Sequence, residues 1–132
     1  MSTDDCKGPV HPQAIEGLRL FNAGRYWAAH EALEAAWIAE KGAVRDLYRG
    51  ILQAAVVYLH VTRANYAGAV KVYGRSQKWL RPWPDVCRGV QVGKLRYDLD
   101  AVIAEVRKLG PEQLAEFDRS LLKTINYESD DA

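Results

Sequence analysis

One stretch of the sequence is apolar on nearly every side of a helix, and this limits what the chain can fold into. The residues from Arg45 to Ala64 predict a helix whose apolar side chains cover almost its whole circumference, at about 100° per residue. A helix that is apolar all round is a buried helix. No apolar run in the sequence reaches the roughly 18–20 residues that span a bilayer. We therefore expect the central helix of a protein without a membrane span.

The polar exceptions in this helix form a narrow stripe. Arg49, Gln53 and His60 fall within about 40° of one another on the helical wheel. Polar groups on a buried helix need hydrogen-bond partners on the elements that face them. The stripe therefore predicts a polar cluster shared with a neighbouring helix.

Helical signals fill the rest of the chain, and no strand alternation stands out. The predicted helices cover residues 12–23, 26–40, 45–64, 66–80 and 94–109, with a short sixth after Gly110-Pro111. Gly24 ends the first helix, and the prolines in Arg81-Pro82-Trp83-Pro84-Asp85 end the fourth. The sequence predicts an all-α compact bundle of about five helices. Residues 11–126 would form a single helical domain, with a disordered tail at 1–10 and a frayed tail at 127–132.

A short pattern occurs twice, 40 residues apart. Gly24-x-Tyr26-x-x-Ala29 and Ala64-x-Tyr66-x-x-Ala69 occupy equivalent places in two consecutive helical hairpins. A small residue at the turn, followed by an aromatic residue and an alanine, lets two helices approach closely, as in tetratricopeptide-type repeats. Two copies are fewer than a solenoid needs, so the pattern predicts a repeat-like helical hairpin inside a compact bundle.

Composition narrows the function classes. The net charge of +1, with both signs interspersed, offers no broad basic surface for nucleic acid or anionic lipid. The basic residues Arg75, Lys78 and Arg81 are interpreted as a solvated face. The polar, acidic N-terminus carries no visible secretory signal, so we expect a cytoplasmic protein. Cys6 and Cys87 form no CxxC motif and are expected to be a reduced pair without a role.

The second predicted helix carries the main chemical clue. Tyr26, Ala29, Leu33 and Trp37 define its core face, and His30 falls among them. Glu34 follows His30 by one turn at the edge of that face, and Glu31 lies further round. A titratable pair near a core costs free energy unless both groups find partners.

Two segments resemble a known family. The first is Phe21-Asn22-x-Gly24-x-Tyr26-x-x-x-His30-Glu31-x-Leu33-Glu34-x-x-Trp37, and the second is Tyr48-Arg49-Gly50-Ile51-Leu52-Gln53-Ala54-Ala55. Together they resemble domain-of-unknown-function family 309 over about residues 15–80. Ala64 departs from the pattern, since glycine is more often expected there. The resemblance implies a small all-helical bundle, found mainly in prokaryotes, whose biochemical activity is not established.

Three interpretations of the polar residues stay open. In the first, His30 and Glu34 bind a divalent metal or perform acid–base chemistry, with His60 as a further ligand and Gln53 nearby. The pattern His-Glu-x-x-Glu is not the His-Glu-x-x-His zinc motif, and the chain has no second Glu-x-x-His. In the second, His30 donates to a carboxylate and Arg49 pairs with Glu31 or Glu34, which forms a buried network that fixes helix register.

The third interpretation is a binding module. Trp27 and Ile38 lie off the core face of the second helix, and Trp79 and Trp83 flank the proline-rich loop. Exposed aromatic residues gather at protein interfaces. The alternative is that these rings cap the ends of a small bundle. We expect a small helical ligand- or partner-binding protein without a cofactor. In the simplest case the partner is a second copy of the same chain. Its polar cluster comprises His30, Glu31, Glu34, Arg49, Gln53 and His60. The alternative is a metal-dependent or acid–base enzyme using His30, Glu34 and His60.

Overall fold

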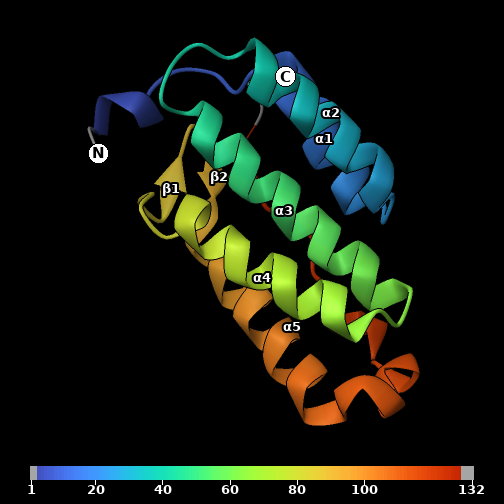
Figure 1. Cartoon of the computed structure of the whole chain (residues 1–132). Helices are drawn as coiled ribbons and strands as arrows, with labels where there is room; N and C mark the ends of the chain where they lie inside the picture. The colour runs from blue at the N-terminus through green and yellow to red at the C-terminus, as the bar shows by residue number, and fades with distance from the viewer. Residues whose placement is uncertain (1–2, 129–132) are drawn as a thin grey trace.

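The structure, a computed structural model, describes residues 3–128 and is a helical bundle with one very small sheet (Figure 1). It confirms the all-α fold class. The helices are α1 (Pro12–Asn22), α2 (Tyr26–Ala39), α3 (Arg45–Thr62), α4 (Tyr66–Leu80) and α5 (Val92–Gln113), with 3-10 turns η1 (Thr3–Cys6), η2 (Leu114–Glu116) and η3 (Arg119–Leu121). The strands β1 (Val86–Cys87) and β2 (Val90–Gln91) form an antiparallel hairpin. Strands of two residues are too short to produce an alternation in the sequence.

Consecutive helices pack against each other, and α3 runs between α2 and α4 (Figure 1). The inner side of α3 is buried, including Tyr48 and Tyr58. The prediction that α3 is buried all round is wrong. Leu52, Val56 and Leu59 are only partly buried, because α2 and α4 cover the flanks of α3 and leave a strip between them open to solvent.

The two hairpins have the same turn, as the repeated pattern predicted. Gly24 and Ala64 both have left-handed backbone angles, with φ of +77° and +54°. The amide of Arg25 donates to the carbonyl of Leu20 at 2.9 Å, and the amide of Asn65 donates to the carbonyl of His60 at 2.8 Å. These bonds satisfy carbonyls at the ends of α1 and α3 in the same way.

The N-terminal segment differs from the disordered tail that we expected at residues 1–10. Residues 3–6 form η1, and a disulfide joins Cys6 to Cys87 with 4.4 Å between their Cα atoms. The expectation that Cys6 and Cys87 are both reduced is therefore wrong in this structure. A pairing across 81 residues leaves no local spacing signal in a sequence.

Arg88, in the turn between β1 and β2, holds the same segment. Its amide donates to the carbonyl of Cys6 at 2.8 Å, its Nε donates to the carbonyl of Asp5 at 2.8 Å, and its Nη1 donates to the carbonyl of Pro9 at 3.1 Å. These bonds reach from the turn to both ends of the segment. The disulfide and Arg88 therefore fix it to the hairpin together.

The C-terminal part also differs in detail. The backbone of Gly110 is not helical, with φ of +71° and ψ of 176°, so it separates the main part of α5 from a last short turn, where the sequence predicted a short sixth helix; η2 and η3 follow this turn. Tyr127, in the expected frayed tail at 127–132, forms an isolated bridge with Val90. Residues 1–2 and 129–132 of the two expected tails lie outside the described residues. Within residues 3–128, no helix is both long and apolar enough to cross a membrane.

Candidate functional site

The candidate site lies on the outer face, by which we mean the solvent side of α2, α3 and α4. α3 lies between α2 and α4 (Figure 1). Helical spacing brings the partly exposed side chains of α3 to the same side of the helix, next to those of its two neighbours. Five of the six residues of the predicted polar cluster lie on this strip or beside it, and Glu31 lies further round α2. The outer face includes Trp27, His30, Glu34, Trp37, Ile38, Arg45, Arg49, Gln53, His60, Lys71, Arg75, Lys78 and Trp79.

A cation–aromatic stack lies at one end of the outer face. The Cζ atom of Arg49 is 5.0 Å from the ring centroid of Trp37 and 4.2 Å from that of Trp79. Arg45 lies over Trp37 at 5.4 Å, and the Nζ atom of Lys78 lies over Trp79 at 4.8 Å. Each such contact contributes about 0.5–1 kcal/mol when exposed and more when desolvated. The stack thus links α2, α3 and α4.

The stack corrects the expected partner of Arg49. We expected Arg49 to pair with Glu31 or Glu34, but its contacts are the indole rings of Trp37 and Trp79. Within the described part of the chain, no carboxylate lies within ion-pair distance of Arg49. Glu34 instead approaches His30, and Glu31 is exposed.

His30 and Glu34 lie one turn apart on α2. His30 Nε2 is 3.5 Å from Glu34 Oε2, at the long end of an ion pair, and the Glu34 side chain is 48% exposed. The imidazole stacks on Trp27 with 4.9 Å between ring centroids. Its Nδ1 is buried and has no hydrogen-bond partner among the described residues. Glu34 and Trp27 therefore both contact the imidazole of His30, but neither gives its Nδ1 atom a hydrogen bond.

His60 occupies a different environment near the turn between α3 and α4. The side chain of Asn65 accepts from the amide of Gly68 at 2.9 Å, and its Nδ2 then faces His60 Nδ1 at 3.2 Å. This orientation makes His60 Nδ1 an acceptor, as in a neutral imidazole. Burial, and secondarily the nearby charge of Arg63, lower the pKa of His60.

The structure does not assemble the three metal ligands that the first interpretation requires. Among residues 3–128, no three His, Cys, Asp or Glu side chains are close enough to hold an ion together. His30 and Glu34 remain a pair, and the neighbours of His60 are Asn65 and Gly68. Gln53 does not join either group, since its buried Oε1 has no partner among the described residues.

Of the four residues of the binding-module interpretation, three contribute to the outer face. Trp27 and Ile38 are 54% and 66% exposed. Trp79 lies in the stack. The expectation for Trp83 is wrong, because it is 2% exposed and belongs to the core. Sequence reasoning missed Arg45, although its spacing of one turn from Arg49 was a usable signal.

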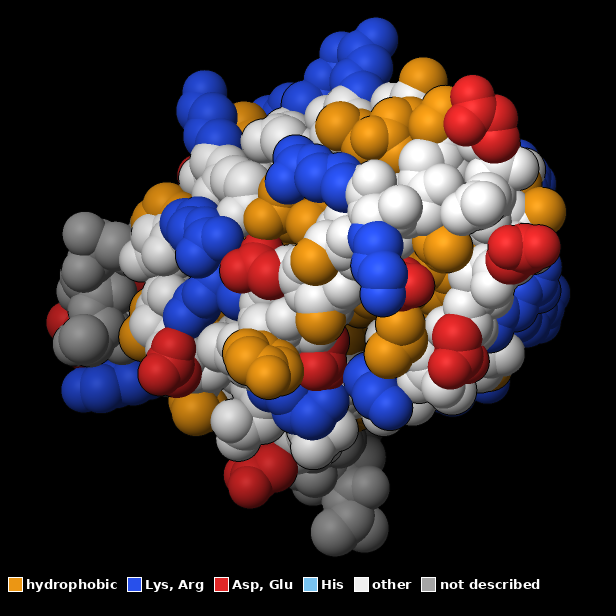
Figure 2. Space-filling model, turned by 90° about the horizontal axis from the view of Figure 1, so that it is seen from below, with side chains coloured by type: hydrophobic (Ala, Val, Ile, Leu, Met, Phe, Trp, Pro, Cys, Tyr) orange, Lys and Arg blue, Asp and Glu red, His pale blue; other side chains and the backbone are white. Residues whose placement is uncertain are grey.

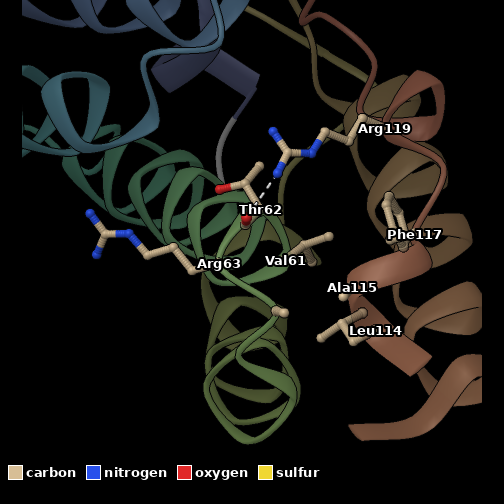
Figure 3. A pocket seen from close by; sticks show the side chains of 8 residues that line it. Val61, Thr62, Arg63, Leu114, Ala115, Phe117 and Arg119 are labelled. Carbon is tan, nitrogen blue, oxygen red and sulfur yellow. Dashed lines mark hydrogen bonds between the residues drawn. The ribbon is translucent and has the colours of Figure 1, made fainter. Parts of the chain in front are cut away.

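Two hollows lie away from the stack. One of about 240 Å³ separates the end of α3 from η2 and η3. Arg119 Nη2 donates to the carbonyl of Thr62 at 3.0 Å across its edge, while the side chain of Arg63 points away (Figure 3). The other hollow, of about 390 Å³, lies beside Trp27 and Glu31 and borders the outer face.

On the surface of the molecule seen from below, acidic and basic side chains alternate with apolar ones (Figure 2).

Comparison with known proteins confirms the family resemblance. Residues 14–72 match the family model described as "Domain of unknown function (DUF309)". This segment runs from α1 into α4 and contains Trp37, Arg45 and Arg49 of the stack, whereas Lys78 and Trp79 follow it.

The chain is also similar to a protein from Aquifex aeolicus (strain VF5). The chain is 26% identical over 100 residues to this "Uncharacterized protein". The matched stretch covers 75% of the present chain and 30% of the relative, so the chain spans less than a third of that longer protein. The family and the relative both carry names that describe no activity.

Proposed function

We propose that this chain is a small helical protein-binding module and that the outer face of α2, α3 and α4 holds its partner. The observation that supports this most is the cation–aromatic stack, in which Arg49 lies over both Trp37 and Trp79. Tryptophan and arginine are the residues most enriched where protein interfaces gain their binding energy. A rigid group of both is suited to anchoring a partner.

The surroundings of the stack support the same proposal. Ile38 and Trp27 expose large apolar side chains on α2, the helix that also carries Trp37, and Trp27 stacks on His30. Exposed apolar groups near a desolvated anchor exclude water from an interface. The hollow beside Trp27 and Glu31 adds a concave border to this face.

A second candidate function is acid–base or metal chemistry at His30 and Glu34. The observation that favours it is the buried, unpartnered Nδ1 of His30, since buried polar atoms normally have partners. It has less support than partner binding, because His30 and Glu34 supply only two side chains. The pair also fits the network interpretation, in which Glu34 orients His30.

The cytoplasmic location stays a prediction. A disulfide that persists is typical of oxidising compartments, whereas cytosolic thiols are kept reduced. Location and the redox state of Cys6 and Cys87 are therefore tested together, by trapping the free thiols with a maleimide reagent at the moment of cell lysis.

The proposed function is tested by photo-crosslinking in the native host. Ile38 is replaced by benzoylphenylalanine, and Tyr97, which is 75% exposed on α5, is replaced in a matched control. We expect a discrete protein adduct from position 38, none from position 97, and loss of the adduct when Trp79→Ala is added. Light scattering of the purified protein shows whether the adduct contains a second copy of this chain. The same adducts from both positions would refute the proposal.

A further inference from the structure

We propose that the partner segment bound by the outer face is acidic and that its carboxylates bind Arg49 and the cations of α4. This inference rests on the function proposed above and names the chemistry of the partner. It concerns a short segment of another protein that carries several aspartate or glutamate residues.

The charges of α4 are the first argument. Between Tyr66 and Leu80 the helix contains no Asp or Glu, and it exposes Lys71, Arg75 and Lys78. Lys71 and Arg75 are one turn apart, and Lys78 follows Arg75 by three residues, so all three point to one side of the helix. Such a row of like charges is destabilising unless opposite charges lie close to it.

The chain itself supplies no carboxylates to this row. Among the described residues, the ion pairs of lysine and arginine neutralise cations elsewhere: Lys7, Arg19, Arg81, Lys94 and Arg96. The cations of the outer face form none of these pairs. Arg45, Arg49 and Lys78 contact indole rings. Arg45 Nε also donates a hydrogen bond to the backbone carbonyl of Trp37 at 3.3 Å. We therefore expect the binding partner to supply the carboxylates that pair with these cations.

The geometry of Arg49 is the second argument. Trp37 reaches it from α2 at 5.0 Å and Trp79 reaches it from α4 at 4.2 Å, so two indole rings contact the guanidinium. Within the described residues its N–H groups have no acceptor, and the residue is partly exposed. A planar guanidinium held by aromatic rings presents its donors as a fixed fork, which matches the two oxygens of a carboxylate. A lysine at this position would lack that fork.

The third argument separates an acidic protein segment from a nucleic acid. Glu34 lies on the α2 side of the outer face, and Glu31 lies further round α2; both are exposed. A nucleic acid places phosphates along its whole length and binds best to an extended basic surface. The carboxylates on α2 limit the basic area to α3 and α4, which suits a short acidic peptide lying along them. The net charge of +1 agrees with a local basic area.

The experiment measures the binding of a fluorescein-labelled hexaglutamate peptide to the full chain by fluorescence anisotropy, at about 0.02 M and about 0.2 M salt. The variants are Arg49→Gln, Arg49→Lys and the pair Lys71→Gln with Arg75→Gln. The matched control is Arg107→Gln, because Arg107 also lies over an aromatic ring, Tyr73 at 5.6 Å, but on α5. Circular dichroism of each variant verifies the fold.

We expect Arg49→Gln to weaken peptide binding by about 10-fold or more, as the loss of a charge-assisted, two-pronged contact does. Arg49→Lys should weaken it nearly as much, because the charge stays and the fork is lost. The exposed α4 pair, which carries little risk for folding, should weaken binding by a similar factor. Arg107→Gln should stay within about twofold of the parent protein.

Three outcomes would overturn the inference. These are no binding of hexaglutamate at the lower salt concentration, equal losses in the Arg49 and Arg107 variants, and tighter binding of oligothymidylate than of the peptide. If any of these occurs while the crosslink from position 38 persists, the partner is not recognised by acidic residues but the proposed function stands. If the crosslink also fails, the proposed function is wrong as well.

Discussion

Gly24 and Ala64 adopt the same left-handed backbone conformation at equivalent turns of two consecutive helical hairpins, with φ of +77° and +54°. Glycine enters this region without steric cost, whereas an L-residue with a Cβ atom is strained there. We therefore expect Ala64→Gly to stabilise the protein by about 0.5–1 kcal/mol. Urea unfolding followed by circular dichroism measures the change.

Gly24→Ala is the matched reciprocal variant. A Cβ at Gly24 would meet no atom within 4 Å, so only the backbone strain is added. We expect a loss of about 1 kcal/mol. If Ala64→Gly lowers the free energy of unfolding, the conformational entropy that glycine adds to the unfolded chain outweighs the backbone strain that it relieves. The shared left-handed conformation of the two turns would then cost Ala64 little free energy.

Much of the fold could be predicted from the sequence, because local signals were consistent with long-range packing. The repeated pattern around Gly24 and Ala64 predicted both hairpins, and helical periodicity predicted the helices to within a few residues at most ends. The exposed strip of α3 could not be predicted. Periodicity reports which side chains are apolar, and only tertiary packing decides that α2 and α4 leave Val56 partly exposed.

The disulfide between Cys6 and Cys87 should contribute strongly to stability. It joins residues 81 positions apart, so it removes much freedom from the unfolded chain. We expect reduction by dithiothreitol to lower the free energy of unfolding by about 2–4 kcal/mol. Urea unfolding with and without the reductant tests this.

The double variant Cys6→Ser with Cys87→Ser is the control, and its stability should not respond to the reductant. A count of two free thiols in the untreated, unfolded protein would show that the bond is absent in solution. In that case Arg88, through its three hydrogen bonds to backbone carbonyls, would hold the N-terminal segment alone.

Trp37 and Trp83 should differ in their contribution to stability. Trp83 is 2% exposed, and removing a buried indole costs about 3–5 kcal/mol, so we expect this loss for Trp83→Ala. Trp37 is only partly buried and lies under two arginines, so Trp37→Ala should cost less, about 1–3 kcal/mol. Thermal unfolding by calorimetry compares the two. Equal losses would mean that the stack is as tightly packed as the core.

His60 should make the stability of the protein depend on pH. Burial, with a smaller contribution from Arg63, lowers its pKa from the ordinary value of 6.5. The unfolded chain therefore binds a proton at a higher pH than the folded chain does. Stability should fall as the pH drops through about 6.5 and level off below the pKa of the folded state.

The variant His60→Gln keeps an acceptor for Asn65 and removes this titration. We expect the melting temperature of the parent protein, relative to this variant, to decline from about pH 7 to about pH 5. Subtracting the variant removes the contribution of the other histidines. A constant difference over this range would show that His60 is solvated as in the unfolded chain.

Less of the candidate site than of the fold could be predicted from the sequence. Helical spacing placed His30 and Glu34 one turn apart, as they are, because both belong to one helix. The predicted partner of Arg49 is wrong, because charge complementarity alone favours a carboxylate on the neighbouring helix. An arginine also binds aromatic faces, and the choice between Glu34 and the two indoles depends on the arrangement of three helices.

Metal addition tests the role of His30 and Glu34 directly. A divalent ion that binds the native state must raise the melting temperature with increasing concentration. Stable zinc sites use three or four protein ligands, whereas His30 and Glu34 supply two. We therefore expect no shift when zinc, manganese or nickel is added to chelator-treated protein. Glu34→Gln should lower stability by under about 1 kcal/mol, since the pair is partly exposed.

The opposite result has a clear reading. A shift that disappears in both Glu34→Gln and His30→Asn would establish a metal site at this pair. Such a result would favour the enzyme alternative over the network interpretation. A shift that survives both substitutions would place the ion elsewhere, and the buried Nδ1 of His30 would then still lack a partner in the metal-bound protein.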